Sequence, residues 1–112
     1  SSGLAGEFLE QHGLVHEMRL LGECWRRIAT DEPVAYGEES LVKAMSEGAI
    51  ETLLISAETL RSDATIEGKS WSDWCKGLND IGAKLVQCST EYDDGQQLVH
   101  FGGAVALLRF NI

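Results

Sequence analysis

Residues 36–55 constrain the fold of this chain most strongly, because they predict a helix, a stop and a buried strand in direct succession. Two glutamates open the expected helix Glu38–Glu47, where carboxylates suit the partial positive charge of a helix N-terminus. Gly48 is expected to end this helix, since glycine adopts the left-handed cap conformation without strain. The apolar run within Thr52–Ile55 then predicts a strand that is covered on both faces.

Two further segments carry the three- and four-residue apolar spacing of amphipathic helices. The first covers Phe8–Thr30 and should end before Pro33, because proline disfavours a helical conformation in the residue before it. The second should begin after the capping residue Ser70 and end at Gly82. The expected apolar faces consist of Leu14, Val15, Met18, Leu21, Trp25, Ile28 and Ala29 in the first helix, and of Trp71, Trp74, Cys75, Leu78 and Ile81 in the second.

The remaining segments complete an alternation of helices and strands. Such alternation predicts an α/β fold, a three-layer α/β/α sandwich with a mixed four-stranded sheet. With no repeat or linker in its sequence, the chain is expected to form one domain. The other expected elements are strands at Val34–Tyr36, Lys84–Cys88 and Ala104–Phe110, short helices at Glu58–Arg61 and Gly95–Phe101, and polar loops at Ser62–Lys69 and Ser89–Asp94.

The charge of the chain argues against a nucleic-acid partner. Its 112 residues carry a formal net charge of -9, and acids outnumber bases in both halves. Tight binding to phosphates requires clustered Lys and Arg. No apolar run approaches the roughly 20 residues of a membrane helix. Three separated cysteines without a Cys-x-x-Cys pair are typical of buried thiols in a reducing cytoplasm, where we expect this protein.

Several residues with chemical potential are better explained by structure. His12 and His16 lie four residues apart without a third ligand, so we interpret them as surface histidines. His100 is interpreted as a partly buried or capping histidine, and Asp94 as the cap of the helix near Gly95. The sequence contains no phosphate-binding glycine motif and no catalytic constellation. We therefore expect no enzyme activity, no cofactor and no metal.

Three blocks of the sequence resemble the C-terminal domain of the Pelota family of ribosome-rescue factors, which is related to class 1 peptide-release factors. The blocks are residues 36–61, with Gly-Ala-Ile-Glu-Thr-Leu-Leu-Ile-Ser at 48–56, residues 82–90, and residues 95–110, which contain Gly102-Gly103. Their order and separations are similar to those of the family. The resemblance implies that residues 4–112 form a single release-factor-type C-terminal domain, and we interpret residues 1–3 as an expression scar.

The resemblance implies a protein-docking role in ribosome rescue and no-go mRNA surveillance. Pelota proteins enter a stalled ribosome with an elongation-factor-like GTPase and then act with the ribosome-recycling ABC-type ATPase. In that family the C-terminal domain contacts both enzymes, so we expect both as partners of this chain. Contact with the ribosome is expected only through the full-length protein, and no membrane partner is expected.

The docking surface is predicted at the carboxyl ends of the strands, where loops of α/β sheets commonly carry binding groups. Tyr92 supplies an amphipathic ring suited to an interface, and its acidic neighbours can steer a basic partner. The alternative is an ordinary solvated loop that caps a helix. The candidate contact residues are Arg61, Tyr92, Asp93, Asp94, Gln96 and Gln97.

Two other identities remain open at this level. Class 1 release factors share the domain but usually carry an insertion, often with metal-binding cysteines, whereas this chain runs on without a Cys pair. The fold also resembles that of kink-turn RNA-binding ribosomal proteins, whose basic turn corresponds here to Gly37-Glu38-Glu39-Ser40. Because two carboxylates at that turn should repel RNA phosphate, we expect no direct RNA binding.

Overall fold

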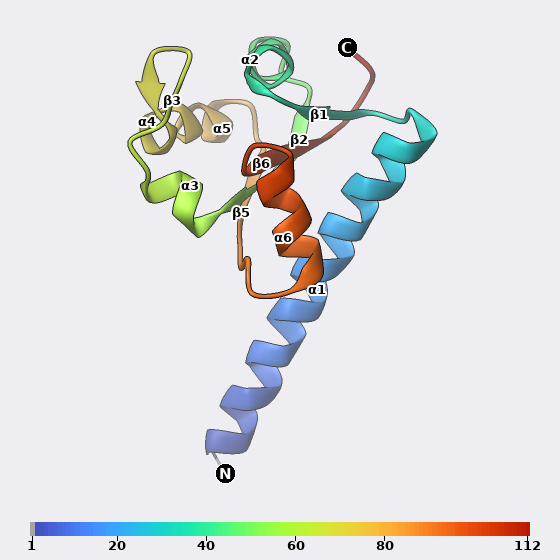
Figure 1. Ribbon diagram of the computed structural model, residues 1–112, viewed down its shortest axis with the longest axis vertical. Helices are drawn as coiled ribbons and strands as arrows, with labels where there is room; N and C mark the ends of the chain where they lie inside the picture. The colour runs from blue at the N-terminus through green and yellow to red at the C-terminus, as the bar shows by residue number, and fades with distance from the viewer. Residues whose placement is uncertain (1) are drawn as a thin grey trace.

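A computed structural model describes residues 2–112, and it describes side chains from Val15 onward. The chain forms the three-layer α/β/α sandwich that its sequence predicts (Figure 1). The order of the strands in its sheet is β1 (Val34–Tyr36), β6 (Ala104–Leu108), β2 (Ile50–Ser56) and β5 (Lys84–Cys88). The sheet is mixed, since β2 pairs in parallel with β5 but antiparallel with β6, which in turn pairs antiparallel with β1.

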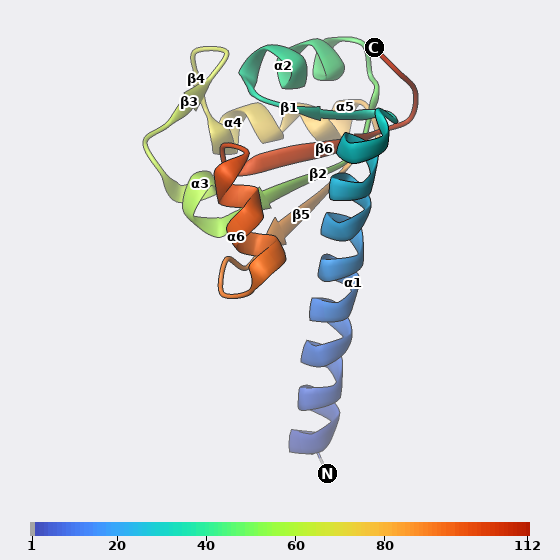
Figure 2. The same ribbon diagram turned by 45° about the vertical axis from the view of Figure 1, so that its right-hand side comes forward.

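The central strand β2 divides the core into two clusters, one on each face of the sheet. Successive side chains of a strand point to opposite faces. Leu54 packs on the face covered by α1 (Ser2–Thr30) and α6 (Asp93–His100), together with Leu21 and Leu98. Leu53 packs on the face covered by α2 (Glu38–Ser46), α4 (Trp71–Cys75) and α5 (Gly77–Asp80). Figure 2 shows these two helical layers with the sheet between them.

Strand β2 lies between two of the strands that the sequence predicts. Val86 of β5 lies opposite Leu54, and Leu107 of β6 lies opposite Thr52. The stop at Gly48 is confirmed, since this residue has a φ of 64°. The Gly48 N–H donates to the Met45 carbonyl, and the Ala49 N–H donates to the Ala44 carbonyl. These two hydrogen bonds are the pair that defines a Schellman cap.

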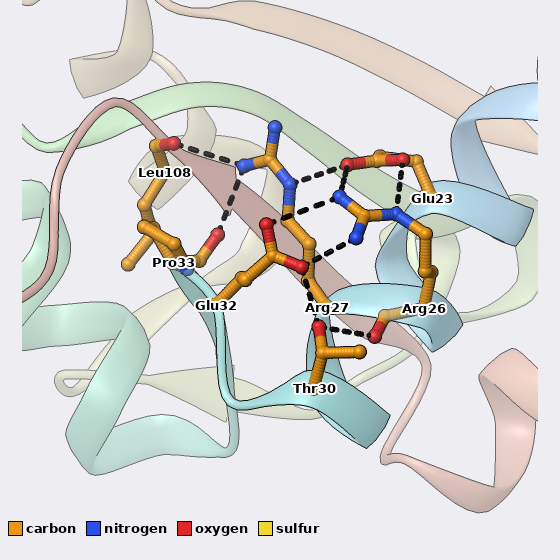
Figure 3. Close-up of polar contacts among 7 residues, drawn as sticks. All are labelled: Glu23, Arg26, Arg27, Thr30, Glu32, Pro33 and Leu108. Atoms are coloured by element: carbon orange, nitrogen blue, oxygen red, sulfur yellow. Dashed lines mark hydrogen bonds and ion pairs between the residues drawn. The ribbon is translucent and has the colours of Figure 1, made fainter.

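Helix α1 is tied to the sheet by a polar network at its C-terminal end (Figure 3). Arg27 donates through Nη1 to the carbonyls of Pro33 and Leu108, at 3.0 Å each, and through Nε to Glu23 at 2.7 Å. Arg26 joins the same Glu23 to Glu32. Hydrogen bonds from Arg26 and Arg27 lower the pKa of Glu23 to about 2. The network fixes the direction of α1, which extends past the rest of the domain (Figure 1).

The apolar face expected for α1 is wrong in part. Val15 is 45% exposed and Met18 is 39% exposed, and Ala29 is exposed as well. The buried positions are Leu21 and Cys24, because only the later turns of α1 lie over the sheet. The side chain of Leu14 lies outside the described residues, as does Ser1.

The polar loop expected over Ser62–Lys69 is instead a short hairpin of β3 (Thr65–Ile66) and β4 (Lys69–Ser70). Its Ile66 is fully buried in the core. The helix expected after Ser70 is divided into α4 and α5, which is where Gly77 weakens helical propensity. Ser70 caps α4 as predicted, accepting a bond from the Asp73 N–H at 3.2 Å.

Other boundaries differ slightly from the expected ones. Strand β6 ends at Leu108 rather than Phe110, since its partner β1 begins only opposite Leu107. Helix α1 begins at Ser2, and β2 is longer than expected at both ends. None of the helices in residues 2–112 combines the length and apolar character that crossing a membrane requires.

Candidate docking surface at the carboxyl ends of the sheet

The parallel strands β2 and β5 end at the same edge of the sheet, and a groove of about 410 Å³ opens there. We call it the carboxyl-end groove. Its walls are formed by Glu17 of α1, by α3 (Ala57–Arg61) and by the segment that follows β5. The residues that line it are Glu17, Ala57, Glu58, Arg61, Gln87, Cys88, Ser89, Thr90 and Glu91.

Helix α3 is held in place by the buried Ser56 at the end of β2. The Ser56 hydroxyl accepts a bond from the Thr59 N–H at 3.1 Å and donates to the Thr59 hydroxyl at 2.7 Å. The Ser56 N–H donates to the Gly103 carbonyl at 2.9 Å. Gly103 has a φ of 90°, and a Cβ there would lie 3.0 Å from the Thr59 Cβ. The wall that carries Arg61 is therefore packed closely against the turn before β6.

Glu17 of α1 fixes the opposite wall. Its carboxylate accepts a hydrogen bond from the Ser89 N–H at 3.1 Å and another from the Tyr92 hydroxyl. Hydrogen bonds to a carboxylate are among the stronger ones in proteins. Burial, and then the bond to Glu17, raise the pKa of Tyr92 above its usual range. Glu17 thus connects α1 to both ends of the segment 89–92.

Gly95 allows this segment to fold back over the first turn of α6. A Cβ at position 95 would overlap the Ser89 carbonyl oxygen and lie 2.9 Å from the Thr90 Cα. The side-chain amide of Gln96 donates to the Thr90 carbonyl, which adds a further bond across the same turn. The groove wall is therefore fixed by backbone contact as well as by Glu17.

The groove presents carboxylates with one guanidinium among them. Glu17, Glu58 and Glu91 line it together with Arg61. Glu58 also accepts a weak bond of 3.4 Å from the Thr90 hydroxyl. A partner that carries Lys or Arg matches this charge, and Arg61 offers it one anchor for a carboxylate or carbonyl.

The predicted contact residues do not all lie in this groove. Arg61 lines it, whereas Asp93 and Gln97 lie exposed on the first turns of the adjacent α6. Tyr92 is partly buried against the cluster beneath α1 and α6. The cap assigned to Asp94 is wrong: the cap position is Tyr92, and among the described residues no side chain bonds the first N–H groups of α6.

Sequence reasoning missed the carboxylates of the groove, Glu17 above all. Glu17 accepts its hydrogen bonds from Ser89 and Tyr92, which follow it by 72 and 75 positions in the chain. No local sequence pattern predicts contacts over such a separation. Glu58 and Glu91 read as ordinary acidic positions of polar segments. The tendency of α/β proteins to bind partners at the carboxyl ends of their strands predicted the correct edge of the sheet, but it did not predict these side chains.

The three cysteines and two of the histidines lie among the residues whose side chains the structure describes. Cys24, Cys75 and Cys88 are buried, as predicted, and burial raises the pKa of Cys88 to about 12. His16 is exposed, as predicted, while the side chain of His12 lies outside the described residues. His100 is exposed in the last turn of α6, so partial burial, one of the two interpretations given for it, is wrong, and the capping interpretation stays a prediction. Among the described residues, no group of three or more His, Cys, Asp or Glu is placed to hold a metal ion.

Comparison with known proteins assigns the chain to a family. The family model for eRF1 domain 3 matches residues 14–112. The pelota homolog of Natronomonas pharaonis is 42% identical over 103 residues, which cover 86% of this chain and 28% of that protein. The pelota homolog of Pyrococcus horikoshii is 32% identical over 110 residues, which cover 98% of this chain and 30% of that protein. This chain therefore spans about a third of the length of these relatives.

Solved structures support the same family assignment. Pelota of Archaeoglobus fulgidus is 31% identical with a TM-score of 0.80, over 95% of this chain and 33% of that one. Dom34 of S. cerevisiae, a translation termination-like factor involved in RNA quality control pathways and interacting with Hbs1, is 25% identical with a TM-score of 0.79, over 97% of this chain and 31% of that one. Ribosome-bound archaeal Pelota with ABCE1 shares the fold, at 24% identity and a TM-score of 0.81, over 97% and 30% of the two chains. The chain belongs to the eRF1 domain 3 family, and its relatives are the C-terminal domains of Pelota proteins, as its sequence predicted.

Proposed function

We propose that this chain is a non-catalytic docking domain of a ribosome-rescue factor in the cytoplasm. It binds an elongation-factor-like GTPase and, in a later step, the ribosome-recycling ABC-type ATPase. The membership of the eRF1 domain 3 family and the similarity to Pelota proteins support this role. The interaction of the related Dom34 with Hbs1 supports protein binding as its basis. Decoding-site contacts and rescue itself belong to the remaining two thirds of such proteins.

The observation that carries the proposal is the carboxyl-end groove with α6 beside it. Its walls are held by Ser56 on one side and by Glu17 on the other, so little conformational entropy is lost when a partner binds. Asp93 and Asp94 on α6 extend the negative charge of the groove onto the adjacent surface. Such a surface accelerates encounter with a basic patch, chiefly at low ionic strength.

The groove chemistry also supports a binding role over a catalytic one. Cys88 is the thiol at the groove, and its raised pKa keeps it protonated at neutral pH. A protonated thiol is a poor nucleophile. Tyr92 is likewise held in its protonated form by burial and Glu17.

The test is the rate at which the domain associates with the GTPase and with the ATPase, measured by stopped-flow fluorescence at two salt concentrations. The variant is Asp93→Lys with Asp94→Lys. The matched control is Glu47→Lys with Glu51→Lys, which changes the net charge equally at the opposite end of β2, where both side chains are exposed. Circular dichroism checks that each variant is folded.

At low salt, the Asp93/Asp94 variant should associate about tenfold more slowly than the parent domain. A factor of this size lies within the range of electrostatic steering. The difference should shrink as salt is added, because the Debye length falls. Equal rates for this variant and its control would place the docking surface elsewhere on the domain.

A further inference from the structure

A second hollow lies between the start of α2, the β3–β4 hairpin and the turn that joins α6 to β6. It measures about 240 Å³, and its apolar walls include Leu41, Trp71 and Phe101. We call it the Trp71 pocket. Gly37 and Gly102 form part of its rim with φ values of 85° and 90°. Among the described residues nothing lies within 4 Å of the place where either Cβ would be, so the rim is open.

The walls of the Trp71 pocket are built from packed aromatic rings. Phe101 stacks on Trp25 with ring centroids 5.1 Å apart, and Tyr36 meets it edge-on at 4.9 Å. Trp71 is fixed in turn by an edge-on contact with Trp74 at 5.7 Å. Tyr36 is not part of the pocket lining, but it is 44% exposed where it contacts the lining residue Phe101. Exposed aromatic residues around a preformed hollow are typical of protein interfaces.

The charge around the Trp71 pocket is mainly negative. Glu38 lines the pocket, and Glu39 beside it is exposed. Glu67 on the hairpin turn donates its N–H to the Glu38 carboxylate at 3.4 Å, which brings a third acid to the same region. Lys69, opposite Ile66 in the hairpin, is the base that accompanies them. An occupant of this region therefore gains from positive charge around an apolar centre.

We propose that the Trp71 pocket docks a protein segment in which one apolar side chain, of leucine or phenylalanine size, is flanked by lysine or arginine. The volume is below the roughly 300–1,000 Å³ of sites for whole small molecules, which matches a single anchoring side chain. Anchors buried in such pockets carry most of the energy of many interfaces. The acids of the rim select the basic flanks and disfavour nucleic acid. The proposal does not depend on the carboxyl-end groove.

The test is a titration of the ¹⁵N-labelled domain with three tripeptide amides, followed by NMR. Arginyl-phenylalanyl-arginine is the probe, and arginyl-alanyl-arginine and glutamyl-phenylalanyl-glutamate are its controls. The probe should shift the Trp71 indole N–H and the amides of Gly37 and Gly102, and these shifts should saturate. The alanine control lacks the phenylalanine ring and its apolar burial, so it should bind at least about tenfold more weakly. The glutamyl control should lose affinity at low salt. Equal affinities for the three peptides would overturn the proposal.

Two kinds of variant locate the site. Ala64→Trp places an indole at the pocket wall, where Ala64 is exposed, and should abolish the shifts. If that variant does not fold, Thr65→Trp at the next lining position serves the same purpose. Glu38→Lys with Glu39→Lys should weaken the probe several-fold, and the equally charged Asp93→Lys with Asp94→Lys should not. Unchanged binding after the pocket is filled, or salt-dependent shifts of the same amides with duplex RNA but not with the probe, would refute the proposal.

Discussion

Replacing Gly95 by alanine tests whether the turn over α6 is as tight as the structure shows. The new Cβ would overlap the Ser89 carbonyl oxygen and lie 2.9 Å from both the Ser89 carbonyl carbon and the Thr90 Cα. These are backbone atoms, so no flexible side chain can give way. The segment 89–92 would have to move away from α6, and the bond from the Ser89 N–H to Glu17 would be strained or lost.

The expected change in the free energy of unfolding is the sum of two destabilising contributions and one stabilising contribution. Overpacking of this kind costs about 1–3 kcal/mol, and a lost hydrogen bond to a carboxylate costs about 1 kcal/mol or more. Alanine gains about 1 kcal/mol over glycine in a helix. The free energy of unfolding of Gly95→Ala should therefore fall by about 1–3 kcal/mol. In urea this corresponds to a midpoint lower by about 1 M for a typical slope of unfolding.

Gly22→Ala is the matched control within the same chain. Gly22 also lies in a helix, but among the described residues nothing lies within 4 Å of its Cβ position. This substitution should raise the free energy of unfolding by about 0.5–1 kcal/mol through helix propensity alone. If both alanine variants are stabilised alike in urea, the close contact of Gly95 with Ser89 does not exist and the account of the groove wall is wrong.

Three further predictions concern the core, the pH dependence of stability and RNA. Leu54→Ala should lower the free energy of unfolding by about 2–5 kcal/mol, since Leu54 is fully buried; an unchanged urea midpoint would contradict its central place. Hydrogen bonds from Arg26 and Arg27 hold the folded-state pKa of Glu23 at about 2, below the ordinary 4.5, so its contribution is complete above about pH 4.5 and is lost as pH falls toward 2. Thermal unfolding across this interval should therefore show a smaller loss of stability for Glu23→Gln than for the parent chain, and parallel curves would refute the ion-pair account. Kink-turn RNA should not bind at low salt in a gel shift, because Glu38 lies exposed at the turn; micromolar, salt-sensitive binding would disprove this.

Local patterns predicted those parts of the fold that depend on local physics. The predicted strand contains the apolar run of Leu53, Leu54 and Ile55, and Gly48 ends α2 because glycine adopts a positive φ without strain. The exposure of Val15 and Met18 could not be predicted in this way. Their spacing suits a buried face, but how far the sheet extends under α1 is decided by tertiary structure.

The hairpin of β3 and β4 was missed because strands of two residues are too short to show a period. Its signal in the sequence was Gly68, which forms the turn together with Glu67; both adopt positive φ values, of 74° and 54°. A non-glycine residue with positive φ is uncommon, and tight two-residue hairpin turns are one place for it. The buried Ile66 in the middle of a polar segment was the second hint.

The candidate site was predictable as a place and only partly as a set of residues. Parallel strands bring their carboxyl ends to one edge, which put Arg61 and the loop after β5 together. Glu17 reaches that edge from α1, whose path over the sheet is set by the bonds of Arg27 to Pro33 and Leu108. A contact that depends on the angle of a helix leaves no pattern in the sequence.

The central claim is that this domain alone binds the translational GTPase and the recycling ATPase. Isothermal titration calorimetry of the isolated, unmodified domain against each purified enzyme measures this most directly, with the full-length protein as the positive control. The account predicts saturable binding of both enzymes by the isolated domain. If both enzymes bind the full-length protein but neither gives saturable binding with the domain, the docking role belongs to the other domains and the account is contradicted.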